Sequence, residues 1–209
     1  MTTPCALLWL AALGLLAEVP EAERLSERAH QDRTIVYFLQ PPETHAFDLY
    51  HDYTESRPGV AAYYNVVRKG STASNARARI LDTGEELRVE SVKGQSLLDA
   101  GVDVGDPVQG EDDVVVAHFT PVPPGGSVRL RISETYKDPL RYALRGDELV
   151  WDRSFGRPRN AVVLPQGYYL TASSIPACIS ETEDGRIRLD FENPRNDDIA
   201  VLIKARRRR

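Results

Sequence analysis

Acidic side chains gather in one stretch of this 209-residue chain, the segment GQSLLDAGVDVGDPVQGEDD at residues 94–113. Calcium binds sets of about six to eight oxygen ligands, which loops of this kind can supply. The candidate ligands are Asp103, Asp106, Asp112 and Asp113. Their spacing matches neither an EF-hand loop nor a calcium-binding repeat, so the alternative is a solvated acidic loop. Apart from calcium at this segment, no cofactor is predicted.

A second set of candidates combines aromatic rings with arginines, in part around the segment FGRPRN at residues 155–160. Exposed rings can stack on a sugar, and a guanidinium can bind a carboxylate or phosphate through two parallel hydrogen bonds. The predicted binding residues are Tyr50, Tyr53, Trp151, Phe155, Arg157 and Arg159. The alternative is structural: rings are ordinary core residues of β-sandwiches, and nearby acids such as Asp152 could pair with the arginines.

Catalytic motifs are missing from the sequence, which has no HExxH, no GxSxG and no glycine-rich phosphate loop. Cys178 lies in an apolar run and is expected to be a buried, inert thiol. Glu134 continues the inward face of the alternating run at residues 128–132, where an acid is unusual. A hydrolase would need His45, His51 or His118 within hydrogen-bond reach of Glu134, Cys178 or the acidic segment. No catalytic residue is predicted.

The elements that would position these groups are short strands. From residue 33 onward, apolar or alternating runs are separated by Gly, Pro, Asn and Asp, as in sandwiches and barrels. Residues 34–39 suit a buried strand, and residues 60–67, apolar on both faces except for Asn65, suit a central strand. The sequence therefore predicts an all-β fold of two stacked antiparallel sheets, an immunoglobulin-like or larger sandwich. Residues 94–112 are either a long loop within it or a boundary between two lobes.

The start of the chain differs from the rest. Residues 6–17, ALLWLAALGLLA, are uncharged and apolar, and they are too short to span a bilayer, which takes about 20 residues. We interpret residues 1–17 as a signal peptide, 18–32 as a polar spacer, 33–204 as the sandwich domain and 205–209 as a basic tail. The alternatives for residues 6–17 are an uncleaved membrane anchor or a helix packed on the domain.

Charge narrows the range of partners. The net charge is −5, although Lys204 and four consecutive arginines at residues 206–209 are positive, so the body of the chain is more acidic than the whole. An acidic body does not favour nucleic-acid binding, and none is predicted. The basic tail could contact an anionic membrane transiently. The excess of arginine over lysine is weakly associated with a bacterial source.

Together these features predict a non-enzymatic module that is periplasmic or secreted. It would present loops or a sheet edge to a protein or cell-envelope partner. The first alternative is an accessory domain that binds carbohydrate or another substrate through surface aromatics, and the second is a hydrolase with an unrecognised site. The sequence predicts no oligomeric state.

Overall fold

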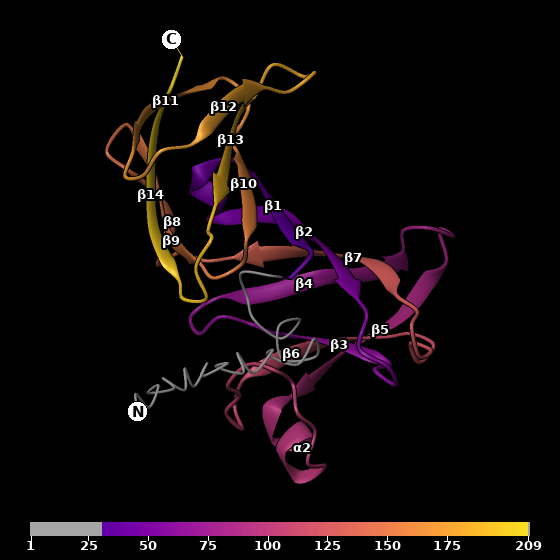
Figure 1. The fold of residues 1–209 in the computed structure, drawn as a ribbon. Helices are drawn as coiled ribbons and strands as arrows, with labels where there is room; N and C mark the ends of the chain where they lie inside the picture. The colour runs from indigo at the N-terminus through magenta and orange to yellow at the C-terminus, as the bar shows by residue number, and fades with distance from the viewer. Residues whose placement is uncertain (1–30, 209) are drawn as a thin grey trace, which may run out of the picture.

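The computed structural model describes residues 31–208, which form two β-sheets and two short helical segments (Figure 1). The strands are β1 (Arg33–Leu39), β2 (Ala46–Glu55), β3 (Ala62–Val66), β4 (Thr72–Ile80), β5 (Glu86–Lys93), β6 (Asp113–His118), β7 (Val128–Lys137), β8 (Tyr142–Arg145), β9 (Glu148–Phe155), β10 (Arg159–Val163), β11 (Tyr168–Ser173), β12 (Cys178–Glu181), β13 (Ile187–Glu192) and β14 (Ile199–Arg207). The helical segments are η2 (Pro42–Thr44) and α2 (Gly94–Asp99). The prediction of an all-β sandwich is confirmed, and its strands outnumber the roughly seven to nine of an immunoglobulin domain.

The larger sheet has ten strands in the order β12-β13-β10-β1-β2-β7-β4-β5-β6-β3, and the smaller has four in the order β11-β14-β9-β8. All paired strands are antiparallel except β1 and β10, which run parallel with Thr34 opposite Arg159. The prediction of purely antiparallel sheets is therefore wrong at this pair. Parallel neighbours need a long crossover, and here the chain builds eight strands before it returns beside β1.

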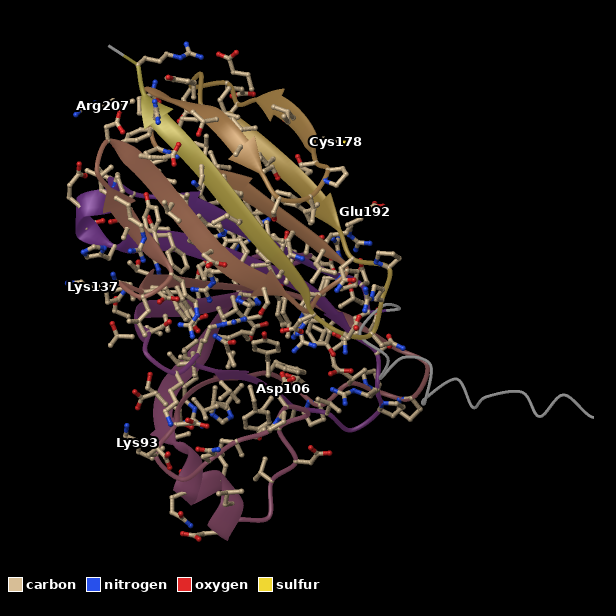
Figure 2. All side chains as sticks on the ribbon, turned by 90° about the vertical axis from the view of Figure 1, so that its left-hand side faces the viewer. Lys93, Asp106, Lys137, Cys178, Glu192 and Arg207 are labelled. Carbon is tan, nitrogen blue, oxygen red and sulfur yellow. The ribbon has the colours of Figure 1, made fainter. Side chains whose placement is uncertain are left out.

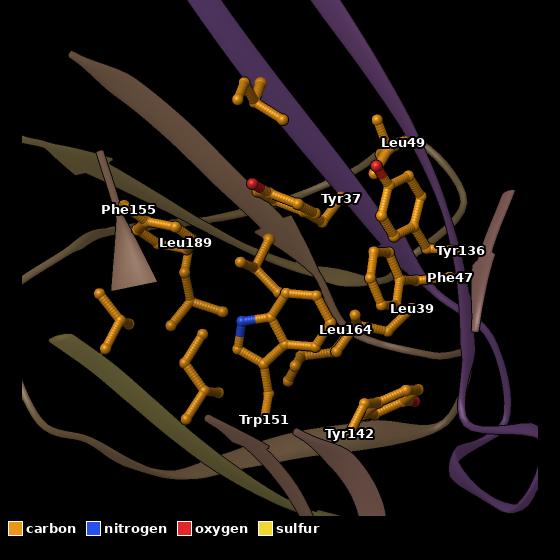
Figure 3. Close-up of a cluster of buried hydrophobic side chains, with 14 of the residues drawn as sticks. Tyr37, Leu39, Phe47, Leu49, Tyr136, Tyr142, Trp151, Phe155, Leu164 and Leu189 are labelled. Carbon is orange, nitrogen blue, oxygen red and sulfur yellow. The ribbon is translucent and has the colours of Figure 1, made fainter. Parts of the chain in front are cut away.

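The small sheet packs face to face with the half of the large sheet that contains β1, β2, β10 and β13, and we call this unit the sandwich. Its core centres on Trp151, which is 0% exposed and makes an edge contact with Phe47 at 4.7 Å between ring centroids (Figure 3). Inward residues alternate along β9 and β14, as the period of two in a half-buried strand requires. The sandwich core is thus apolar and aromatic.

The remaining strands, β7, β4, β5, β6 and β3, form the curled half, which lies below the sandwich in Figure 1. β3 is five positions from β2 in the sheet order, yet its Tyr63 meets His51 of β2. The sheet therefore curls back on itself around a small second core. This core contains Tyr63, Ala78, Ala117, Leu130 and Ile132.

The prediction that residues 60–67 form a central strand is wrong, because β3 is the last strand of the large sheet. Its two-sided apolar character has another cause. Tyr63 faces the second core, whereas Ala62, Tyr64 and Val66 face a third cluster around Leu97 of α2. An edge strand covered on both faces has the same apolar pattern as a central strand.

The acidic segment provides that outer cover. Lys93 at the end of β5 pairs with Asp113 at the start of β6, so residues 94–112 are an excursion within one hairpin. Val102, Val104 and Val108 pack against the outer face of β6, while the intervening Asp103 is exposed. Of the two alternatives for residues 94–112, the register supports a long connection within the sheet.

Two further expectations are corrected by the C-terminal strands. Cys178, expected to be buried, is exposed on β12, because β12 is the short outer strand of the large sheet (Figure 2). The domain was expected to end at residue 204, but β14 continues to Arg207 and buries Ala205. The start of the basic tail is therefore part of the small sheet, with Arg206 opposite Glu148.

The expected signal peptide at residues 1–17, and the spacer up to residue 30, lie outside the described residues. Within residues 31–208, none of the helices has the length and apolar character needed to cross a bilayer.

Candidate functional site

A polar seam separates β3 from β1 and β2, because β3 pairs through its backbone with β6 alone. Side chains close the seam instead. The Tyr63 hydroxyl lies 3.5 Å from Nδ1 of His51, and Nδ2 of Asn65 donates to Oε2 of Glu134 at 2.7 Å. Nδ2 of Asn65 also donates to the Tyr136 hydroxyl at 2.9 Å. Tyr63 and His51 thus connect the curled half to the sandwich through polar groups, and Asn65 connects β3 to β7.

A cavity of about 270 Å³ opens in this seam, and we call it the seam pocket. A second cavity of about 260 Å³ adjoins it and shares four of its lining residues. The shared residues are Arg33, Tyr63, Asp106 and Arg157. Figure 2 shows Asp106 below the sandwich, on the side of the curled half. The floor of the seam pocket is apolar, with Ile35, Tyr37 and Leu49 on the inward face of β1 and β2.

Four arginines line the seam pocket, and three of them have protein partners. Arg153 donates from Nη1 to Oδ2 of Asp138 at 2.6 Å. Arg157 donates from Nη2 to Oδ2 of Asp106 at 2.7 Å, and Arg68 donates to the hydroxyl and carbonyl of Ser154. Arg33 is 6% exposed, and it forms no salt bridge with a carboxylate among residues 31–208. The pocket wall therefore carries positive charge.

Burial shifts the titration of two groups at the base of the seam. Burial raises the pKa of Glu134, which is 2% exposed, to about 7, and hydrogen bonding from Asn65 opposes this shift. Burial lowers the pKa of His51 well below its usual range, and nearby Arg33 lowers it further. The two side chains approach to 3.9 Å, but a neutral imidazole makes no salt bridge with Glu134.

The contacts of the histidines bear on the hydrolase alternative. The His51–Glu134 separation of 3.9 Å is beyond hydrogen-bond reach, and His118 and His45 bond to Glu90 and to the carbonyl of Tyr142. Within residues 31–208, no serine, threonine or cysteine side chain hydrogen-bonds to a histidine. The condition set for a hydrolase is not met. A nucleophile with an adjacent base is the arrangement that hydrolysis by covalent catalysis requires.

The predicted binding residues lie in different parts of the structure. Arg157 lines both cavities, and Tyr53 lines the second one beneath Arg33. Tyr50 packs under Arg131 on the outer face of the large sheet, and Arg159 pairs with Asp32 at 2.5 Å away from the seam.

The expectation that Trp151 and Phe155 are surface rings is wrong, because they are 0% and 1% exposed. Both occupy inward positions of β9, and both pack on Tyr37 in the sandwich core. A sugar cannot stack on rings that the second sheet covers, so these two residues are part of the core.

The four predicted calcium ligands do not converge. Asp106 pairs with Arg157, and Asp113 pairs with Lys93 at 2.5 Å. Asp103 and Asp112 accept hydrogen bonds from the backbone amides of Gly105 and Gln109. Across residues 31–208, no three His, Cys, Asp or Glu side chains form a group that could hold a metal ion.

Sequence reasoning missed Arg33, Arg68, Asn65 and Tyr136 as seam residues. Two of them carried a signal. Asn65 is the one polar residue in the run at residues 60–67, and Arg33 shares the inward face of Ile35 by strand alternation. Glu134 was recognised as an unusual inward acid, and its burial is confirmed. The curl that joins these positions was not visible in the sequence, because it depends on contacts between distant strands.

No protein-family model matches the chain, and no curated protein matches it in sequence. Among solved structures, an aminopeptidase N family protein from Idiomarina loihiensis aligns over 82% of this chain and 29% of its own, with a TM-score of 0.47 and 8% identity. An M1 zinc metallopeptidase from Deinococcus radiodurans aligns over 83% of this chain and 41% of its own, with a TM-score of 0.45 and 14% identity. This chain spans less than half the length of either protein. These similarities assign no role to any residue here.

Proposed function

We propose that this chain is a non-catalytic binding module that acts outside the cytoplasm and holds a small polar ligand in the seam pocket. The observation that carries the proposal is the cavity of about 270 Å³, where buried polar side chains from the sandwich and the curled half converge on an apolar floor. Ligand sites usually combine an apolar surface with placed polar groups, and the seam pocket has both, with a larger share of polar groups than is usual.

A thermal-unfolding screen against amino acids, sugars and organic acids tests the binding. A ligand that binds the native state raises the unfolding temperature. We expect that Ile35→Phe, which places a larger side chain at the pocket floor, removes the shift. The control Val150→Phe, which adds a ring at a partly buried position outside the pocket, should keep it. The recovered ligand should be chemically unchanged. A shift that survives Ile35→Phe would place the binding elsewhere, and conversion of the ligand would contradict a non-catalytic role.

The extracytoplasmic location rests on residues 6–17. Expression of the full chain in a bacterium, followed by fractionation and intact-mass measurement, should give a periplasmic or secreted species shortened near Ala17. A full-length cytosolic product would contradict this part of the proposal, and a full-length membrane-bound product would support the anchor.

A second candidate function is the presentation of a sheet edge to a protein or envelope partner. The observation in its favour is β12, a four-residue outer strand whose residues are all exposed, with Ile179 59% exposed. Unpaired strand edges can accept an added strand. A photo-crosslinking residue in place of Ile179 should then give one defined adduct in the envelope fraction. A matched probe at Tyr169, exposed on the small sheet, should not.

A further inference from the structure

Arg33 is a buried cation without an anionic partner in the described part of the chain. Its Nε is fully enclosed and has no hydrogen-bond acceptor. Its guanidinium carbon lies 4.5 Å from the centroid of the Tyr53 ring and 5.0 Å from that of Tyr63. Stacking on the two rings offsets only part of the cost of burying an ion. The guanidinium is therefore ready to pair with an anion.

The aspartates of the pocket wall form no salt bridge with Arg33, although burial lowers the pKa of Arg33 and the charge of Asp106 offsets part of this effect. Asp106 lies 2.7 Å from Arg157, and Asp198, the other aspartate of the lining, accepts a hydrogen bond from Ser154. The lining contains four arginines and two aspartates, although the chain as a whole carries a net charge of −5. A positive cavity in an acidic protein selects a negative ligand, and it attracts that ligand more strongly than the surrounding surface does.

The shape of the cavity restricts the ligand further. Ile35, Tyr37 and Leu49 provide an apolar floor next to the guanidinium. The volume of about 270 Å³ is slightly smaller than the roughly 300 Å³ at which sites for drug-sized molecules begin. A small molecule with one anionic group and a compact apolar body fits both features.

We propose that the seam pocket binds a small organic carboxylate, whose anionic group pairs with Arg33 and whose apolar body rests on Ile35, Tyr37 and Leu49. This inference rests on the proposed binding function and specifies its ligand class. Arg33 acts here as the anionic anchor, since its planar guanidinium can meet a carboxylate through two hydrogen bonds.

Benzoate and benzamide test the inference as a matched pair, because they share a ring and differ in charge. We expect calorimetric titration to show that benzoate binds at least about tenfold more tightly than benzamide, the factor that about 1.4 kcal/mol of added interaction gives. Arg33→Met should reduce benzoate binding to the benzamide level. The control Arg131→Met, which removes an arginine stacked on Tyr50 outside the pocket, should leave both affinities unchanged.

The outcomes separate this inference from the proposed function. Equal binding of benzoate and benzamide, both lost in Ile35→Phe, would overturn the carboxylate assignment and leave the pocket as a ligand site. Binding of inorganic phosphate in place of benzoate would also overturn it. If neither aromatic compound binds, the carboxylate inference fails, and the ligand screen decides the proposed function independently. The unfolding temperature of Arg33→Met without ligand shows whether that variant is folded.

Discussion

The sandwich core and the seam are built on one continuous sheet, but they are closed in different ways. In the sandwich, the small sheet covers β1, β2, β10 and β13, and Trp151 and its neighbours fill the space with apolar contacts (Figure 3). In the seam, β3 approaches β1 and β2 without backbone pairing, and Arg33, His51 and Glu134 are buried there instead. Buried ionisable groups cost stability unless they are paired. In our proposal, the sandwich provides stability and the seam holds the ligand.

The largest effect is expected in the sandwich. Trp151→Ala removes the central ring of the core, and loss of a buried tryptophan typically costs about 3–5 kcal/mol in the free energy of unfolding. Urea denaturation followed by circular dichroism measures this change. A loss below about 1 kcal/mol would mean that the sandwich core is not the main source of stability.

The two buried arginines should respond in opposite directions. Arg153→Met leaves Asp138 buried without its closest cationic partner, so we expect a loss of about 3 kcal/mol in the free energy of unfolding. Arg33→Met removes a buried cation that has no anionic partner, and it should stabilise the ligand-free protein by about 1 kcal/mol. Chemical denaturation of both variants at one pH measures the difference. Equal destabilisation would show that Arg33 has a structural role.

Glu134 should make stability depend on pH. Its folded pKa of about 7 lies above the value of 4.5 for a free glutamate, so the folded state holds the proton more tightly. Its contribution is therefore present at acidic pH and is lost as the pH rises from about 4.5 to about 7, by about 3 kcal/mol. Glu134→Gln should match the wild type near the acidic end and exceed it in stability above pH 7.

Titration of His51 changes stability with pH in the opposite direction to that of Glu134 over part of this pH range. Its folded pKa lies well below the 6.5 of a free histidine, so its contribution to stability increases as the pH rises towards 6.5. The comparison of wild type with Glu134→Gln at each pH cancels this effect. A constant difference between the two proteins from pH 4.5 to 8 would contradict the raised pKa of Glu134.

The smallest effect is expected for Tyr63→Phe. The hydroxyl lies 3.5 Å from Nδ1 of His51, at the limit of a hydrogen bond, so its loss should cost about 0.5 kcal/mol. The ring remains under Arg33, and the stacking is kept. Chemical denaturation of the variant and the wild type measures this difference in the free energy of unfolding. A cost above about 2 kcal/mol would show that this contact is a principal connection across the seam.

The sequence predicted the strands well, because alternation and turn residues are local signals. The Asp184-Gly185 turn between β12 and β13 and the alternation along β7 are examples. The positions of the strands were harder to predict. β3 looked central because α2 and the valines after it cover its outer face. Trp151 looked available for binding because the sheet that covers its side chain comes from distant parts of the sequence. The candidate site was missed for the same reason, since its residues meet only when the sheet curls.

The most direct test of the seam as the binding region is a nuclear magnetic resonance titration of the arginine Nε–H signals with benzoate. Loss of one signal in Arg33→Met assigns Arg33, and the other arginines are assigned in the same way. We predict that the Arg33 signal shifts most, with a smaller change at Arg157, and that Arg131 and Arg186 outside the seam pocket do not shift. Larger shifts at those outer arginines than at Arg33 would contradict the assignment of the seam as the binding region.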